Sequence, residues 1–238
     1  TQYGKVVLAY SGGLDTSVIL KLLVDMGVEV VAYTADLGSS EYAQQNLQQA
    51  KQKALDLGAS KAIIDDLKGE FVSRFVNKAI MANCLYQGNY PCSTALARPL
   101  IAEKLVETAG KENATAIAHG CTGKGNDYLR FHVSVKALNP RLEVLAPVRD
   151  WQFTRDEEIE YAQKAGVQVP TTKKSPYSVD ANIWGRSSEG GAIEFEDQQV
   201  PQDALEWVSP AEKTPDAPAN VKIHFESGIP TKAEFDEK

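Results

Sequence analysis

A glycine turn between a buried strand and an amphipathic helix most limits how this chain can fold. The turn lies within Tyr10–Ser17, which has the sequence YSGGLDTS. Before it, Val6–Ala9 is an aliphatic and β-branched run, typical of a strand buried on both faces. After it, apolar residues recur at helical spacing from Val18 to Met26, and Gly27 is placed to end the helix. A strand, a glycine turn and a helix in this order aim backbone N–H groups at an anion.

The side chains of this turn favour a phosphate as the anion. Glycines let the backbone approach a phosphate closely, and hydroxyl groups can donate hydrogen bonds to its oxygens. The residues concerned are Gly12, Gly13, Ser11, Thr16 and Ser17. A carboxylate beside phosphates makes sense mainly with Mg²⁺ between them, so Asp15 is the candidate metal ligand. The alternative is an ordinary strand-to-helix turn, capped by a serine or an aspartate.

The spacing of this motif separates it from one well-known phosphate loop and matches another. A Walker A loop needs four residues between its first glycine and a GK[ST] ending, and this turn lacks them. The pattern resembles instead the SGGxD[ST] motif of the PP-loop ATP pyrophosphatases. Those enzymes bind the β,γ-pyrophosphate of ATP and cleave between the α and β phosphates.

Strand and helix patterns alternate up to about residue 170. Strands are expected at residues 28–34, 61–66, 114–118 and 144–146, and helices at 40–57, 70–85, 99–112 and 154–165. This alternation predicts an α/β fold with a doubly wound, mostly parallel sheet. Beyond it we expect loops at residues 175–178 and 185–191 and a strand at 221–226. The sequence thus predicts a nucleotide-binding domain at 1–170 and the start of a second, incomplete α+β domain at 171–238.

A second glycine turn, His119–Asp127 (HGCTGKGND), follows the strand expected at 114–118. Lys124 can meet a phosphate as a point charge, and the neighbouring amide and carboxylate can bind a polar substrate. Alone, the stretch is equally consistent with a flexible turn. We expect His119 to be a hydrogen-bonded structural residue and not a ligand, since no second histidine or thiol cluster accompanies it. Two glycine turns at the ends of parallel strands favour a nucleotide site. The stretch 86–98 could line a small-molecule site or merely connect elements at the surface.

Composition excludes several other functions. The chain has 238 residues, with 25 basic and 32 acidic side chains, a net charge of −7 and a pI near 5.1. An acidic chain argues against broad nucleic-acid binding. The three cysteines form no C-x-x-C pair and the three histidines lack zinc-site spacing, so we expect no transition metal. No apolar run is long enough to span a membrane and no signal peptide is evident, so we expect a cytoplasmic protein.

Taken together, the motifs resemble those of the argininosuccinate synthase family over essentially the whole chain. The matching segments are LAYSGGLDTS, AYTADLG, YPCSTALARPLIA, IAHGCTGKGND, SPYSVDANIWGRSSEGG and TPDAP. The resemblance implies synthesis of argininosuccinate from citrulline, aspartate and ATP, with Mg²⁺ present and with release of AMP and pyrophosphate. The citrulline ureido oxygen would attack the α-phosphorus to give citrullyl-AMP, and the aspartate amine would then displace AMP.

The resemblance also implies a role for each matching residue. The ATP-binding residues would be Ala9, Tyr10, Ser11, Gly12, Gly13, Leu14, Asp15, Thr16, Ser17, Ala35 and Gly120. Aspartate would contact Thr122, Asn126 and Asp127, and citrulline would contact Tyr90, Asn126, Arg130, Ser178 and Ser187. No protein nucleophile is needed, so catalysis would rest on positioning and on charge stabilisation. We assign that electrostatic work to Gly12, Gly13, Lys124 and Mg²⁺ at Asp15.

The chain departs from the family pattern at several positions. Ala95 replaces a frequent serine, and Tyr128 and His132 replace glutamine and glutamate beside the second turn. The family continues past residue 238 with further citrulline contacts and an oligomerisation helix, and it is homo-oligomeric, with a tetramer expected. We therefore expect a member truncated at its C-terminus. The alternatives are another PP-loop ATP pyrophosphatase and a truncated protein that binds ATP without ligating its substrates.

Overall fold

The computed structural model describes most of the chain, which folds into two compact units. The described residues are 3–38, 41–122, 125–151, 155–167, 177–205 and 207–235. The first unit comprises Thr1–Gly69 and Ala95–Thr171, and the second comprises Glu70–Thr94 and Thr172–Lys238. The second unit therefore includes a stretch of sequence well before residue 170. The expected domain boundary at that residue stays a prediction.

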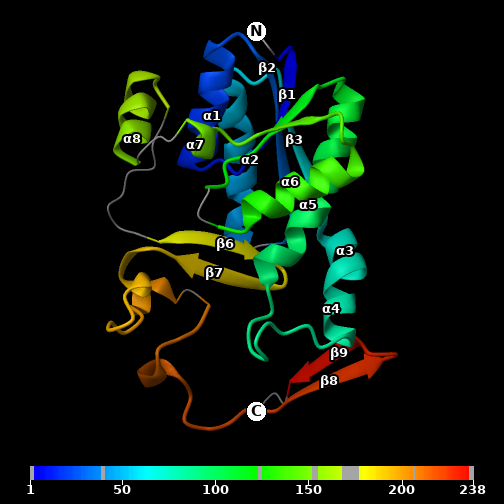
Figure 1. The fold of residues 1–238 in the computed structure, drawn as a ribbon. Coiled ribbons are helices and arrows are strands. Elements are labelled where there is room, and N and C mark those ends of the chain that lie inside the picture. The colour runs from blue at the N-terminus through cyan, green and yellow to red at the C-terminus, as the bar shows by residue number, and fades with distance from the viewer. Residues whose placement is uncertain are drawn as a thin grey trace. The chain divides into compact units, whose positions relative to one another are not determined.

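A five-stranded sheet forms the centre of the first unit (Figure 1). Its strands are β1 (Lys5–Ala9), β2 (Glu29–Asp36), β3 (Lys61–Asp66), β4 (Ala116–Ala118) and β5 (Glu143–Leu145). Every neighbouring pair is parallel, and the order is β3-β2-β1-β4-β5. Helices α1 (Leu14–Asp25) and α2 (Glu41–Asp56) cover one face, while α5 (Ser93–Glu112) and α6 (Asp127–Leu138) cover the other. This arrangement confirms the predicted doubly wound parallel sheet.

The central strands form because their side chains are apolar on both faces. Val6, Val7 and Leu8 of β1 are fully buried, as are Val30 and Val31 of β2. Such continuous burial requires helices on both sides of the sheet. The order of the strands places the chain reversal beside β1, where open parallel sheets bind ligands at their carboxyl edge.

Two predicted helices differ from the structure at their ends. The helix predicted at 70–85 is one helical stretch of α3 (Lys68–Phe71), the π-helix η1 (Val72–Val76) and α4 (Asn77–Met81). It ends early because Asn83 adopts a positive φ of 48° and the N–H of Cys84 donates to the carbonyl of Ala79 at 2.9 Å. This is a Schellman-type ending.

Helix α5 begins six residues before the predicted start at Pro99, which lies inside it. Proline lacks the N–H that would bond the preceding turn. Ala97 and Leu100 are fully buried, and their packing stabilises the additional turn. Residues 93–98, predicted as part of a loop, are therefore helical.

The remaining short helices lie near the end of the first unit. Helix α7 (Pro147–Asp150) follows β5, and α8 (Arg155–Lys164) agrees with the helix predicted at 154–165. Residue 154, the expected first residue of that helix, lies outside the described residues. Among the described residues, no helix is both long and apolar enough to cross a membrane.

The second unit contains two antiparallel hairpins, β6–β7 and β8–β9. Besides η1 and α4, its elements are β6 (Ser178–Asn182), β7 (Gly185–Glu189), β8 (Val221–Glu226), β9 (Ile229–Phe235) and the 3₁₀ turns η2 (Gly191–Glu194), η3 (Gln202–Ala204) and η4 (Ala211–Lys213). The loops predicted at 175–178 and 185–191 are wrong where β6 and β7 form. Cross-strand pairing and the turn at Asn182 stabilise these polar segments despite their weak strand propensity. The strand predicted at 221–226 is confirmed.

Candidate functional site

The first glycine turn joins β1 to α1 at the carboxyl edge of the sheet. Gly13 precedes the first residue of α1, so the unbonded N–H groups of this helix begin here. Gly12 has a φ of +81°, which residues with a β-carbon rarely adopt. A β-carbon at Gly12 would also lie 2.7 Å from Cβ of Ala50 on α2. The turn therefore requires glycine at position 12 for both its conformation and its space.

Hydroxyl groups fill the inside of this turn. The Ser17 hydroxyl donates to the Gly13 carbonyl at 2.6 Å, which anchors the start of α1. The Gly13 N–H donates to Oγ of Ser11 at 3.3 Å, and that oxygen lies 3.1 Å from Oγ1 of Thr16. Ser11 is exposed, so a phosphate oxygen could take the place of its hydroxyl at the Gly13 N–H. Tyr10 is buried, and its hydroxyl lies 3.2 Å from Oγ of Ser17, so its side chain supports the turn from the core.

The second glycine turn meets the first at the start of α1. A β-carbon at Gly120 would lie 3.0 Å from Cγ2 of Thr16 and 3.9 Å from Cβ of Asp15. The two turns therefore approach so closely that a side chain at Gly120 would require Thr16 to shift. Strand β2 ends beside them, where the Thr34 hydroxyl donates to the Tyr10 carbonyl at 2.7 Å and Ala35 follows.

The structure thus gathers most of the predicted ATP-binding residues at one edge of one sheet. Lys124, to which we assigned electrostatic work, lies outside the described residues. Among the described residues, no group of three or more histidine, cysteine, aspartate or glutamate side chains could hold a metal ion. Asp15 alone supplies a carboxylate on the first turn of α1.

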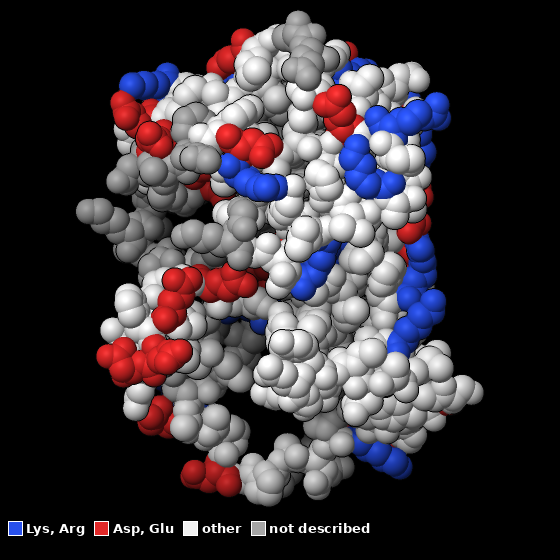
Figure 2. Space-filling view, in the orientation of Figure 1, with Lys and Arg blue, Asp and Glu red and all other residues white. Residues whose placement is uncertain are grey.

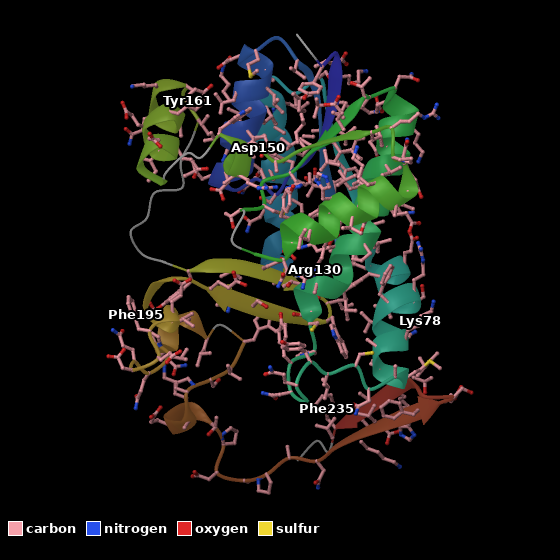
Figure 3. All side chains as sticks on the ribbon, viewed as in Figure 1. Lys78, Arg130, Asp150, Tyr161, Phe195 and Phe235 are labelled. Carbon is pink, nitrogen blue, oxygen red and sulfur yellow. The ribbon has the colours of Figure 1, made fainter. Side chains whose placement is uncertain are left out.

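An acidic residue between two arginines begins helix α6. Asp127 accepts a hydrogen bond from Nε of Arg98 at 2.9 Å and another from Arg130 at 2.7 Å. Burial alone would raise the pKa of Asp127, but the two guanidinium groups overcome it and hold that pKa below its ordinary value. Figure 3 shows Arg130 projecting from α6. The Asp127 carboxylate is therefore an ionised, oriented acceptor beside the second glycine turn.

Sequence reasoning missed the part played by Arg98. It lies on α5 in the family-like segment YPCSTALARPLIA, so a signal was present, but nothing local indicates a partner 29 positions later. Asn126 directly precedes Asp127 and is exposed, as is Thr122 earlier in the second glycine turn. Asn126 and Asp127 thus lie side by side at the start of α6.

The two unusual residues near the second turn belong to an aromatic cluster around His119. The His119 ring stacks on Phe131, with centroids 5.4 Å apart, and meets the edge of Tyr128 at 5.8 Å. The Arg149 guanidinium lies 4.3 Å from the Tyr128 ring centroid, and His132 packs against the same ring at 5.4 Å. Tyr128 and His132 therefore pack against one another, and Tyr128 packs against His119 at the start of the second glycine turn.

His119 is a structural residue, in agreement with the sequence analysis. The Cys121 N–H donates to its Nδ1 at 3.3 Å, and its side chain is 1% exposed. Burial lowers the pKa of His119 from 6.5 to about 4, because the charged form loses its hydration. The ring is consequently neutral at physiological pH.

This shift predicts a loss of stability in mild acid. Since the unfolded chain binds a proton near pH 6.5 and the folded chain only near pH 4, acidification favours unfolding between these values. The shift in pKa corresponds to a loss of about 3 kcal/mol in the free energy of unfolding, which is reached by pH 4. Denaturant unfolding should show that the free energy of unfolding of the wild type falls from pH 7 to pH 4. The slope of this decrease should be much smaller in His119→Phe. An unchanged slope in His119→Phe would contradict the assignment.

Residues predicted to bind citrulline also lie in the second unit. The Tyr90 hydroxyl is 3.5 Å from Oγ of Ser187 on β7, and Ser178 pairs with Glu189 at the other end of the hairpin. Asn182 anchors this hairpin by donating to the Ser93 carbonyl at 2.9 Å. Tyr90 and Ser187 are thus brought together, while Asn126 and Arg130 belong to the first unit.

A cavity of about 470 Å³ also lies in the second unit. Its lining is mainly apolar, and none of the predicted site residues contributes to it. The lining residues include Trp184, Ile193, Val200, Leu205, Trp207 and Val208. Acidic side chains gather over the end of β7 and the segment after it, where Glu189, Glu194 and Glu196 are exposed (Figure 2).

Comparison with known proteins decides the family. Residues 5–168 match the model of the arginosuccinate synthase N-terminal HUP domain, and residues 177–238 match that of the arginosuccinate synthase C-terminal domain. The chain belongs to the argininosuccinate synthase family. The matches together cover nearly all of the sequence, which confirms the resemblance found in its motifs.

Relatives in this family are close in sequence but longer. The argininosuccinate synthase of Bacillus licheniformis is 54% identical over 230 residues, covering 97% of this chain and 56% of the relative. That of Bacillus subtilis is 51% identical over 226 residues, covering 95% of this chain and 55% of the relative. The chain thus spans little more than half the length of these argininosuccinate synthases.

A solved structure supports the fold assignment. A 4-thiouridine synthetase, solved in complex with RNA and with bound ATP, matches with a TM-score of 0.52 and 20% identity. The match covers 69% of this chain and 41% of the synthetase. At this identity the likeness shows the fold alone.

Proposed function

We propose that this chain carries the ATP site of an argininosuccinate synthase and takes part in joining citrulline to aspartate. The observation that carries the proposal is the contact between the two glycine turns, Gly120 against Thr16 and Asp15, in a chain of this family. ATP would bind along Ala9–Ser17, with Ala35 and Gly120 beside it. The products would be argininosuccinate, AMP and pyrophosphate.

The backbone donors at Gly12 and Gly13 suit the departing pyrophosphate. A helix N-terminus and nearby N–H groups stabilise negative charge that develops there, and they need no reorganisation during the reaction. Because the citrulline ureido oxygen is itself the nucleophile, the protein has to align it with the α-phosphorus. Positioning and charge stabilisation would therefore account for the rate.

Asp15 fits a role in holding Mg²⁺. Its carboxylate stands on the first turn of α1 beside the Gly120 backbone, and carboxylate oxygens are ligands that Mg²⁺ prefers. With no acidic cluster among the described residues, phosphate oxygens and water would supply the other ligands. The ion, when bound, would offset charge on the phosphates.

The two amino-acid substrates would bind to polar residues outside the ATP site. We assign aspartate to Thr122, Asn126 and Asp127, since an ionised carboxylate at Asp127 can hold the ammonium group of an amino acid. We assign citrulline to five residues that include a guanidinium group suited to a carboxylate: Tyr90, Asn126, Arg130, Ser178 and Ser187. Lys124 would add positive charge near the phosphates.

Several wider properties follow from the family and stay proposals. We infer a cytoplasmic enzyme that acts on small molecules, without nucleic-acid or membrane partners, in keeping with the pI near 5.1. A homo-oligomer, with a tetramer expected, follows from the family. Membership of this family favours the ligase over another PP-loop enzyme.

Calorimetry with nucleotides tests the ATP site directly. With Mg²⁺ present, ATP and pyrophosphate should bind and compete with one another, while AMP should bind more weakly. A chain that binds neither ATP nor pyrophosphate while folded would contradict the proposal. Asp15→Asn should weaken ATP binding in Mg²⁺ more than in EDTA, whereas Asp66→Asn, at an exposed ion pair with Lys68, should change neither.

A further inference from the structure

A lysine of helix α2 contacts the first glycine turn, and the ATP-binding residues above do not include it. Nζ of Lys53 donates to the carbonyl of Gly12 at 3.1 Å. Ala50, three positions earlier on the same helix face, is the residue that a β-carbon at Gly12 would strike. One face of α2 therefore covers Gly12 with both a packing contact and a hydrogen bond.

The charge of Lys53 has no acidic counterpart in the part of the chain that the structure describes. The side chain is partly buried, and burial lowers its pKa, with no neighbouring carboxylate to offset that effect. A cation partly removed from water without a counter-charge reduces stability. A negatively charged ligand at the turn would supply that counter-charge.

The hydrogen bond also fixes the direction of a backbone donor. The Gly12 carbonyl and the Gly13 N–H belong to one planar trans peptide, so they point in opposite directions. With the carbonyl held by Lys53, the Gly13 N–H points to Oγ of Ser11. A positive charge at the carbonyl polarises the peptide and strengthens its N–H as a donor.

We propose that Lys53 is a positioning residue for a polyphosphate ligand. By bonding the Gly12 carbonyl, it presents a polarised Gly13 N–H to a phosphate oxygen, which replaces the Ser11 hydroxyl. The inference rests on the proposed ATP site and adds a residue from outside the glycine motif. It assigns α2 a part in recognising the phosphates of the nucleotide.

Calorimetry on the full 238-residue chain tests this role with ATP, pyrophosphate and AMP. Lys53→Met should weaken ATP and pyrophosphate binding by about tenfold, the effect of one lost charge-assisted interaction, and AMP binding by less than about twofold. Lys53→Arg keeps the charge and the donors, and should recover most of the affinity. Lys51→Met, on the same helix and also partly exposed, should bind all three ligands as the wild type does.

Each other outcome has a definite meaning. Unchanged pyrophosphate affinity in a folded Lys53→Met protein would overturn the inference, as would an equal loss for AMP, which indicates a general packing role. Should Lys53→Met unfold, Lys53→Gln keeps a donor to Gly12 without the charge. Undiminished pyrophosphate binding by Lys53→Gln would also overturn the inference.

If the wild type binds ATP and Lys53→Met binds it equally, only the proposed role of Lys53 fails. If the wild type binds neither ATP nor pyrophosphate, the proposed function fails.

Discussion

Gly12→Ala is expected to abolish detectable ATP binding. The substitution places a β-carbon at a φ of +81° and 2.7 Å from Cβ of Ala50, so the turn must move. The conformational and steric penalties together should lower the free energy of unfolding by about 2 to 4 kcal/mol. Displacement of the turn also withdraws the Gly13 N–H from its place. Calorimetry and denaturant unfolding measure the two effects separately.

The neighbouring glycine provides a matched control. Gly13 has a φ of −68°, which any residue adopts, and a β-carbon there would meet only Oγ of Ser11 at 3.3 Å. Gly13→Ala should therefore lower the free energy of unfolding by less than about 1 kcal/mol. The double variant Gly12→Ala with Ala50→Gly removes the collision but not the strained φ, so it should recover part of the stability. Wild-type ATP affinity in a folded Gly12→Ala protein would contradict the phosphate-binding role of this turn.

Asp127→Asn should reduce the use of aspartate far more than the binding of ATP. The carboxylate bonds Arg98 at 2.9 Å and Arg130 at 2.7 Å, and the amide cannot hold both guanidinium groups as an anion does. The loss of a charge-assisted contact to the substrate ammonium should lower kcat/KM for aspartate on the order of 100-fold. Steady-state kinetics at varied aspartate, together with ATP calorimetry, checks this prediction.

Two comparisons keep the Asp127 result interpretable. Asp66→Asn removes an exposed carboxylate that pairs with Lys68, and its aspartate kinetics should match those of the wild type. Arg98→Lys keeps a positive charge near Asp127 without the fixed fork of donors, so its loss should be smaller than that of Asp127→Asn. Equal losses of ATP binding and aspartate use in Asp127→Asn would show that this carboxylate is not specific to aspartate.

The sequence predicts the sheet and the glycine turns because these depend on local patterns. The run KAIIDD coincides with β3, and the aliphatic run before the first turn forms β1. Both turns follow strands that end at one edge, so their contact through Gly120 follows from a parallel sheet. The position of the candidate ATP site could be predicted to the same extent, because a strand, a glycine turn and a helix in this order fix the backbone geometry of the turn.

Contacts between distant segments account for what the sequence did not reveal. Lys53 meets Gly12 across 41 positions and Arg98 meets Asp127 across 29, and neither pair has a local pattern. The β6–β7 hairpin depends on Asn182, whose carbonyl oxygen accepts from the N–H of Trp184 at 2.8 Å while its amide bonds a carbonyl 89 positions away. Serine and glycine in β7 favour loops by propensity, and this anchoring overrides them.

Release of pyrophosphate from this 238-residue chain tests the central claim most directly. The chain is incubated with Mg²⁺ and ATP, with and without citrulline, and then with aspartate added. If the chain assembles the adenylation site, pyrophosphate release should require citrulline and continue with turnover once aspartate is present. No release despite measured ATP binding would contradict the ligase function and leave a protein that only binds nucleotide. Release at the same rate without citrulline would also contradict it, because the chain would then cleave ATP without the amino-acid substrate.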